Sequence, residues 1–239
     1  MRQASLYPIY YPTMDAKLPP KNIRAILFDL DGTLIDSEKI TDRAVAELLA
    51  QQQIEDPDLD FLQFHGINWK HLEKLLKDRF PSLADVAVLG FLERRFYEIS
   101  TAEPPPLLPG ARAAFLAASA QVPTAIVTGS GAVDVEAFLD RANLRTACSF
   151  YLSYEMYSPS KPAPNGYRIA AERLHTPPEQ CLVFEDSQPG LTAARTAGMP
   201  TVAITYSSPQ PPPGLADQII EDYTHLPTDF FAAITTQGA

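Results

Sequence analysis

Two pairs of acidic side chains in this sequence could act together on one substrate. Asp29 and Asp31 follow a short apolar run, and Glu185 and Asp186 follow another. Ligands of an open parallel sheet bind beyond the carboxyl ends of its strands, so both pairs are expected at one sheet edge. Carboxylates that converge there would repel one another unless a cation lay among them, and oxygen ligands favour magnesium. Alone, Asp31-Gly32 is more typical of a solvent-exposed turn, and the second pair is what favours a metal site.

Two further segments carry groups that could hold a phosphate. Thr128, Gly129 and Ser130 follow a third apolar run and precede a helical pattern, so they offer hydroxyl and backbone N–H groups. Thr128 alone could equally be a helix N-cap, and Gly129 lets either neighbouring hydroxyl approach a phosphate. Lys161 precedes Pro162 and offers a positive charge, although a lysine by itself is usually exposed. Together these segments predict a phosphate site beside the acidic groups.

These groups need a framework that brings the ends of several strands together. Four apolar runs each predict a strand buried on both faces: 25–28, 124–127, 181–184 and 201–204. A weaker fifth run covers residues 150–153. Helical spacing of apolar residues fills the intervals between runs. This alternation predicts an α/β fold with a doubly wound, Rossmann-like parallel-sheet core.

One interval breaks the alternation of strands and helices. From residue 37 to residue 103 the apolar residues have helical spacing only, which predicts an inserted α-helical domain. Prolines at the end of this interval stiffen the return to the sheet. We therefore expect a core of residues 21–36 and 104–239, a helical domain of residues 37–103, and a loose extension of residues 1–20.

The composition disfavours several classes of protein. Of the 239 residues, 46% are hydrophobic and 20% are charged, which is typical of a globular fold. The 29 acidic and 19 basic residues give a net charge of −10, which disfavours binding to nucleic acid or to an anionic membrane. No apolar run approaches the roughly 20 residues that span a bilayer, and the cysteines show no disulfide or zinc pattern. We therefore expect a cytoplasmic protein without nucleic-acid or membrane partners.

Taken together, the four polar segments resemble the motifs of a known enzyme superfamily. In order, they are Phe28-Asp29-Leu30-Asp31-Gly32-Thr33-Leu34, Ile126-Val127-Thr128-Gly129-Ser130, Ser160-Lys161-Pro162-Ala163-Pro164 and Val183-Phe184-Glu185-Asp186-Ser187. Their order and spacing resemble those of the haloacid dehalogenase-like (HAD) hydrolases, in the branch of β-phosphoglucomutases and sugar-phosphate phosphatases. The resemblance covers about residues 24–226 and implies that the helical insertion is a cap domain over the active site.

The resemblance implies how the acidic residues act. Asp29 would be the nucleophile that forms an aspartyl phosphate, and Asp31 would be the general acid and base. Asp29 and Asp186 would bind Mg²⁺ through side-chain oxygens, and Asp31 would bind it through its backbone carbonyl. Glu185 would be a more distant or water-mediated partner of the metal.

The same resemblance implies how the phosphoryl group is held. Thr128, the backbone of Gly129 and Lys161 would contact the phosphoryl oxygens as charge spreads over them. Lys161 should also keep Asp29 ionised by proximity. Whether Thr128 or Ser130 supplies the hydroxyl stays open.

Residues of the expected cap are weaker candidates for substrate contacts. By resemblance, His65 stands where mutases have a lysine, and Arg95 lies near another mutase cation. With Lys70, they form a set of candidate substrate-binding residues, although a solvated helix face is the commoner place for each. Thr41 stands where β-phosphoglucomutases carry a histidine, which weakens the mutase interpretation.

Three hypotheses about function follow. The leading one is a Mg²⁺-dependent phosphatase of small phosphorylated metabolites, such as sugar or polyol phosphates. The alternative is a phosphosugar isomerase that resembles β-phosphoglucomutase. A third is a binding or regulatory protein without turnover, which Asp31 disfavours because a binder could most easily spare that residue.

Overall fold

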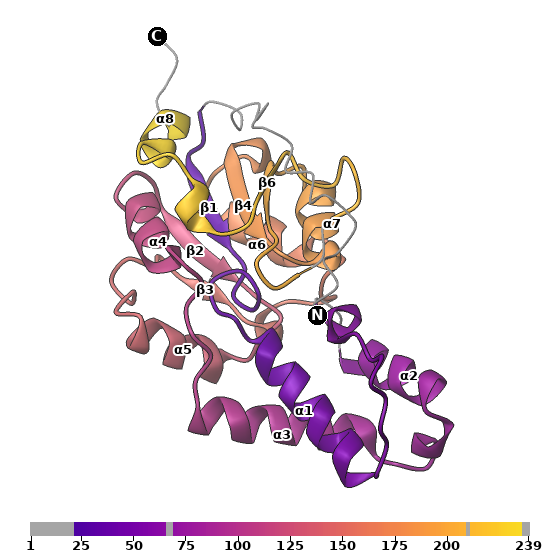
Figure 1. Ribbon diagram of the computed structural model, residues 1–239. Coiled ribbons are helices and arrows are strands. Elements are labelled where there is room, and N and C mark those ends of the chain that lie inside the picture. Colours follow the sequence, from indigo (N-terminus) through magenta and orange to yellow (C-terminus); the bar gives the residue numbers. More distant parts are fainter. Residues whose placement is uncertain (1–21, 66–68, 209–210, 236–239) are drawn as a thin grey trace, which may run out of the picture.

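A computed structural model describes residues 22–65, 69–208 and 211–235 of the protein, so the predicted extension of residues 1–20 lies outside the described residues. Its centre is a six-stranded parallel sheet with the strand order β3-β2-β1-β4-β5-β6 (Figure 1). The strands are β1 (Ala25–Phe28), β2 (Thr124–Val127), β3 (Tyr151–Leu152), β4 (Cys181–Glu185), β5 (Thr201–Ile204) and β6 (Gln218–Ile220). The sequence prediction of a parallel α/β core is confirmed.

Helices cover both faces of this sheet. They are α4 (Ala111–Ser119), α5 (Ala132–Arg141), α6 (Asn165–Arg173), α7 (Gln188–Ala197) and α8 (Phe230–Thr235). Apolar side chains of α4, α5 and α8 share one buried cluster, and those of α6 and α7 share a second. Figure 1 shows these two groups of helices on opposite sides of the sheet. The core is therefore doubly wound.

The central strands are continuous apolar runs because their successive side chains pack into two apolar clusters, one on each face of the sheet. In β1, Ile26 and Phe28 belong to the cluster of α4, α5 and α8, whereas Ala25 and Leu27 belong to the cluster of α6 and α7. The ring of Phe28 stacks on that of Phe184 in β4, with their centroids 4.8 Å apart. Both faces of the strand are thus buried, which holds its carboxyl end in place.

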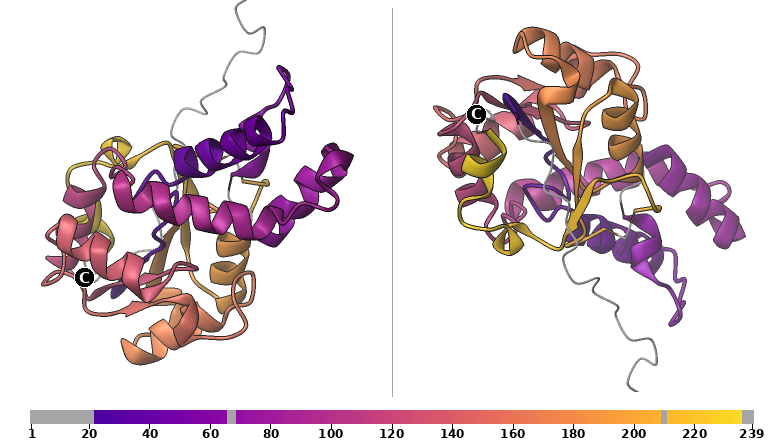
Figure 2. Two further views of the ribbon diagram at one scale, coloured as in Figure 1. Left: turned by 90° about the horizontal axis from the view of Figure 1, so that it is seen from below. Right: turned by 90° about the horizontal axis from the view of Figure 1, so that it is seen from above.

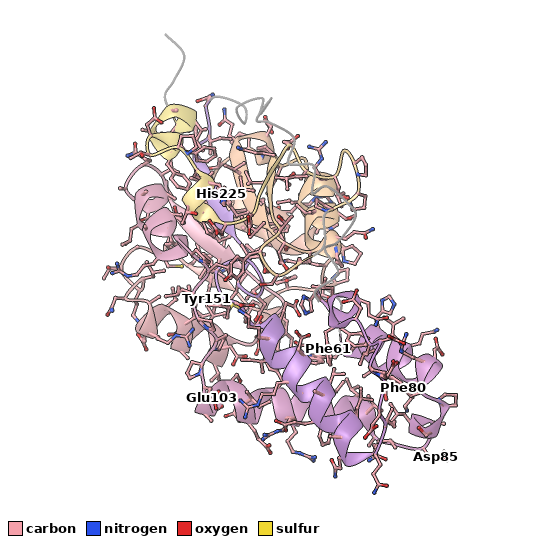
Figure 3. All side chains as sticks on the ribbon, in the orientation of Figure 1. Phe61, Phe80, Asp85, Glu103, Tyr151 and His225 are labelled. Atoms are coloured by element: carbon pink, nitrogen blue, oxygen red, sulfur yellow. The ribbon has the colours of Figure 1, made fainter. Side chains whose placement is uncertain are left out.

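Between β1 and α4 the chain forms a separate group of helices, here called the three-helix unit. It consists of α1 (Glu38–Gln51), α2 (Trp69–Arg79) and α3 (Val88–Ala102). These helices enclose an apolar cluster of their own, and Phe61 and Phe80 pack against it (Figure 3). Figure 1 shows the unit at one end of the sheet, and in Figure 2, seen from below, the unit lies in front of the core.

The two connections between the three-helix unit and the sheet run side by side. The backbone N–H of Asp36 donates to the carbonyl of Pro106 (2.9 Å), and that of Leu108 donates to the carbonyl of Leu34 (3.0 Å). The chain therefore enters and leaves the unit through two adjacent connecting segments, which are hydrogen-bonded to each other. Where the insertion begins and ends as a domain stays a prediction.

Short 3-10 helices complete the described chain. They are η1 (Phe61–Phe64), η2 (Pro81–Leu83), η3 (Tyr154–Met156), η4 (Pro178–Gln180) and η5 (Tyr223–His225). Within the described ranges, none of the helices is both long enough and apolar enough to cross a membrane.

Candidate active site

The carboxyl ends of three neighbouring strands meet at one cavity. Because β1 lies between β2 and β4, the residues that follow these strands come close together. Asp29 follows β1 and Thr128 follows β2. Glu185 is the last residue of β4, and Asp186 comes next. The cavity has a volume of about 850 Å³ and reaches from this sheet edge to the three-helix unit.

Most of the residues predicted to act on the substrate line this cavity. They are Asp29, Asp31, Thr128, Gly129, Lys161 and Asp186. Glu185 is buried beside it and contacts Lys161. The structure thus brings together side chains that lie more than 150 positions apart in the sequence, as in the 3.1 Å hydrogen bond from Thr33 to Asp186. Their chemical roles stay predictions.

Three buried carboxylates in this site lie close enough to share a cation. One ligand atom from each of Asp29, Glu185 and Asp186 falls within 4.8 Å of the others. Burial raises the pKa of the Asp186 carboxyl well above its usual range, and the charges of Glu185 and Asp29 raise it further. The protein therefore holds these groups where they repel one another.

Lys161 supplies a positive charge to this cluster. Its ammonium donates to Asp29 Oδ1 and to Glu185 Oε1, each at 2.5 Å, and to the carbonyl of Val127 at 3.0 Å. Burial nevertheless raises the pKa of Asp29 well above its usual range, although the ammonium lowers it. Lys161 thus favours the ionised form of Asp29, as the resemblance implies, but does not by itself offset the effect of burial on the pKa.

The donor set of this site fits a divalent cation. One ammonium faces three carboxylates, and the hydrogen bonds described for Asp186 come from two hydroxyl groups, those of Thr33 and Ser208. Carboxylate oxygens are hard ligands, which Mg²⁺ prefers over nitrogen or sulfur ligands. A cation among these oxygens would remove the repulsion that burial imposes on them.

Glu185 is held by donors on both of its oxygens. Oε1 accepts hydrogen bonds from Lys161 and from the Tyr167 hydroxyl (3.1 Å), and Oε2 accepts from the backbone N–H and the hydroxyl of Ser187 (3.0 Å each). A Cβ at Gly190 would lie 1.7 Å from Oε1, so the helix can pass this close only as glycine. These contacts orient Glu185, and they would suit a supporting position beside a metal ion.

Gly32 allows the turn after the two aspartates to pass close to Asp186. Its φ is +73°, in the left-handed region, and its N–H donates to the carbonyl of Ile35 at 2.8 Å. A Cβ at this position would lie only 2.1 Å from Asp186 Oδ2. The residue therefore has to be glycine for both conformational and steric reasons.

The hydroxyl groups after β2 have different partners. Ser130 donates its hydroxyl to Asp31 Oδ2, and its backbone N–H donates to Thr128 Oγ1 at 3.0 Å. The backbone carbonyl of Thr128 accepts from the Tyr157 hydroxyl at 2.9 Å. Ser130 therefore orients Asp31, while Tyr157 fixes the backbone that carries Thr128.

The three candidate residues of the expected cap do not line the cavity. Arg95 pairs with Glu47 and with Glu98, and Lys70 is exposed on α2. His65 is buried between Asp42, at 2.9 Å from Nε2, and the carbonyl of Ser207, which accepts from Nδ1. Their part in substrate binding remains untested. Thr41, which bears on the mutase alternative, does line the cavity.

Sequence reasoning missed three residues that support the site. Ser208 donates to Asp186, Tyr167 donates to Glu185, and Ser187 both donates to Glu185 and caps α7 through the N–H of Gly190 (3.1 Å). Ser187 could have been found, because it directly follows the acidic pair. Ser208 follows a different strand, and no spacing pattern connects it with Asp186.

The chain is similar in sequence and in fold to known hydrolases. The chain is 28% identical over 182 residues to fructose-1-phosphate phosphatase YqaB of Escherichia coli K12, across 75% of this chain and 95% of that protein. It is 27% identical over 210 residues to the phosphoglycolate phosphatase of the same strain, across 78% of this chain and 82% of that protein. A solved HAD family hydrolase from Deinococcus radiodurans R1, with bound phosphate and sodium, has a TM-score of 0.72 and 26% identity. That comparison covers 92% of this chain and all of the other.

The family itself is identified by a match over most of the chain. The family model described as haloacid dehalogenase-like hydrolase matches residues 23–198, a range that includes every residue assigned above to the metal and phosphate sites. The superfamily and the hydrolase class expected from the four motifs are confirmed. The chain belongs to the haloacid dehalogenase-like hydrolases.

Proposed function

We propose that the protein is a Mg²⁺-dependent phosphatase that hydrolyses small phosphorylated metabolites, such as sugar or polyol phosphates, through an aspartyl phosphate. The observation that carries this proposal is the convergence of Asp29, Asp186 and Lys161 at one cavity. A nucleophilic carboxylate, an acidic metal-binding cluster and a fixed cation are the groups that phosphoryl transfer requires.

Asp29 and Asp31 divide the chemistry in this proposal. An oxygen of Asp29 attacks phosphorus, the bond from phosphorus to the ester oxygen breaks, and Asp31 gives its proton to the departing alcohol. Asp31 then takes a proton from the water that attacks the aspartyl phosphate, which releases inorganic phosphate and restores Asp29. The hydrogen bond from Ser130 to Asp31 supports this assignment because it orients the carboxyl that moves both protons.

Asp29, Asp186 and the backbone carbonyl of Asp31 would hold the metal ion, with Glu185 as a supporting partner. A bound Mg²⁺ would supply positive charge that offsets the carboxylates and the phosphoryl oxygens. Lys161 adds a fixed charge at the same place. Among the hydroxyl groups, the engagement of Ser130 with Asp31 favours Thr128 as the donor to phosphate.

The three-helix unit would act as a cap, with domain boundaries near residues 37 and 103. Its residues form one side of the cavity, and it joins the sheet through two adjacent stretches of chain. Such a connection would let the unit close over a bound substrate and exclude bulk water. In this arrangement the sheet edge supplies the chemistry, and the cap selects the substrate.

The proposal is tested by the release of inorganic phosphate from a panel of phosphate esters. We expect hydrolysis that requires Mg²⁺ and stops when EDTA removes it. The absence of phosphate release from every ester would refute the proposal. Conversion of β-glucose 1-phosphate to glucose 6-phosphate, primed by a bisphosphate, would instead support the mutase alternative, which the threonine at position 41 disfavours.

A further inference from the structure

We propose that the cavity selects phosphate monoesters whose leaving alcohol carries no negative charge. This inference rests on the proposed phosphatase function and narrows its substrate class. It predicts that alcohols bearing only hydroxyl or hydrocarbon groups are accepted, whereas a carboxylate or a second phosphate on the alcohol is rejected.

The side of the cavity that would face the leaving alcohol is largely apolar. The three-helix unit and η1, which lies between α1 and α2, contribute four large apolar side chains to the lining: Phe64, Trp69, Leu72 and Phe96. The rings of Trp69 and Phe96 meet edge to face, with their centroids 5.3 Å apart. An ionic group against this surface would lose water without gaining a partner.

The polar part of the lining is acidic. Among the lining residues that the structure describes, the acidic side chains are Asp29, Asp31, Glu38, Glu155 and Asp186, and the one cationic side chain is that of Lys161. The ammonium of Lys161 lies between Asp29 and Glu185, at the place where the transferred phosphoryl group would bind. It is therefore not placed to bind a second anionic group on the alcohol.

Two cationic side chains that are adjacent in the sequence to lining residues are engaged by acids outside the lining. Lys39 pairs with Asp36, and Arg95 pairs with Glu47. None of these four residues lines the cavity, and neither does Lys70, which is exposed on α2. Glu38, in contrast, lines the cavity from the first turn of α1. A helix N-terminus attracts anions, but here the carboxylate of Glu38 already lies at that position.

These observations predict how the site treats two otherwise similar esters. A carboxylate on the alcohol would lie against an apolar surface and within reach of the Glu38 charge, with no cation other than Lys161 among the described lining residues. A hydroxymethyl group in the same place carries no such penalty. The site would thus resemble one for fructose 1-phosphate, the ester named for one relative, rather than one for phosphoglycolate, named for the other.

The test compares esters that differ only in this charge. The value of kcat/KM is measured with Mg²⁺ for glycerol 3-phosphate against 3-phosphoglycerate, and for 2-hydroxyethyl phosphate against phosphoglycolate. We expect at least about tenfold higher kcat/KM for the uncharged member of each pair. Equal or faster hydrolysis of the carboxylated members would overturn the inference and leave the phosphatase function standing. Failure to hydrolyse any ester would refute the phosphatase function, and this inference with it.

A pair of matched variants tests the contribution of Glu38. Glu38→Gln removes one charge from the lining with little change in shape, and we expect it to reduce the discrimination between paired esters by about threefold or more. Glu93→Gln removes a charge from the exposed surface of α3, outside the lining, and should leave the ratio unchanged. An unchanged ratio in a folded Glu38→Gln protein would exclude Glu38 as a determinant, and an equal shift in both variants would point to net charge alone.

Discussion

The sheet edge and the three-helix unit treat charged side chains in opposite ways. At the sheet edge, Asp29, Glu185 and Asp186 are buried, close together and held by hydrogen bonds. In the three-helix unit, ion pairs such as that between Arg43 and Glu47 lie on the surface, and most of the side chains that face the cavity are apolar, although Glu38 also lines it. In the proposed function, the reactive groups thus lie where the sheet fixes them, and the helices would present the surface that meets the variable part of a substrate.

The largest expected effect comes from the residue proposed to attack phosphorus. Asp29→Asn removes the nucleophile and keeps the size of the side chain, so we expect kcat to fall by about 10⁴-fold or more. Asp85→Asn, on the exposed surface of the three-helix unit (Figure 3), should leave kcat unchanged. Phosphate release measures both, and substantial activity in Asp29→Asn would exclude the aspartyl phosphate.

Two glycine substitutions contrast the two regions directly. Gly32→Ala places a Cβ 2.1 Å from Asp186 Oδ2 at a φ of +73°, so we expect kcat/KM to fall about 10²-fold and stability to fall by about 1–3 kcal/mol. Gly90→Ala, within α3, meets nothing within 4 Å and should stabilise the protein by about 0.5–1 kcal/mol. Kinetics and urea unfolding measure the two effects. Similar losses in both variants would contradict the steric argument.

A smaller effect is expected from the hydroxyl group that supports Asp186. Ser208→Ala removes its hydrogen bond to Asp186, so we expect the Mg²⁺ concentration for half-maximal activity to rise about tenfold, with kcat at saturating Mg²⁺ largely kept. The neighbouring Ser207 donates to Asp36 at 2.9 Å instead, and Ser207→Ala serves as the matched control. Equal Mg²⁺ dependence in the two variants would argue against a positioning role for Ser208.

The last effect is on stability rather than on catalysis, and it concerns the contact of His65 with the sheet region. Burial lowers the pKa of the imidazole, but hydrogen bonding to Asp42, the charge of Glu38 and the Ser207 carbonyl raise it to about 9. Because this pKa exceeds the usual histidine value of 6.5, the stabilisation of the fold by protonated His65 is fully present below pH 6.5 and is lost as the pH rises through 9. We expect a loss of about 2–3 kcal/mol across this range.

Unfolding at several pH values measures this contribution. His65→Gln should be less stable than the unchanged protein at pH 6 and should approach it by pH 10. A constant difference between the two proteins over this range would show that ionisation of His65 contributes nothing to stability.

The strands could be predicted because each is a continuous apolar run. In a parallel sheet covered on both faces, every side chain of a central strand is buried, so the pattern depends little on distant parts of the chain. The run at 150–153 was weaker because only Tyr151 and Leu152 form β3 at the sheet edge. Glu185 is part of the buried strand β4 although it is acidic, because Lys161, Tyr167 and Ser187 donate hydrogen bonds to its carboxylate.

The candidate residues of the helical insertion could not be placed in the same way. Helical spacing shows which residues share a face, but not which face meets the cavity. Arg95 turns to Glu47, which lies 48 positions away on another helix, and His65 turns to a loop after β5. These pairings depend on how the helices pack together.

By itself, the sequence determined the parallel sheet, the helical insertion and the identity of the groups beyond β1, β2 and β4, because apolar periodicity and short polar motifs are local properties. Only the tertiary structure decided that Ser208 supports Asp186, that Ser130 engages Asp31, and that apolar rather than cationic side chains face the cavity from the helices. The physical reason is that hydrogen bonds and cavity linings form between residues distant in the chain, whose orientation is set by packing rather than by spacing.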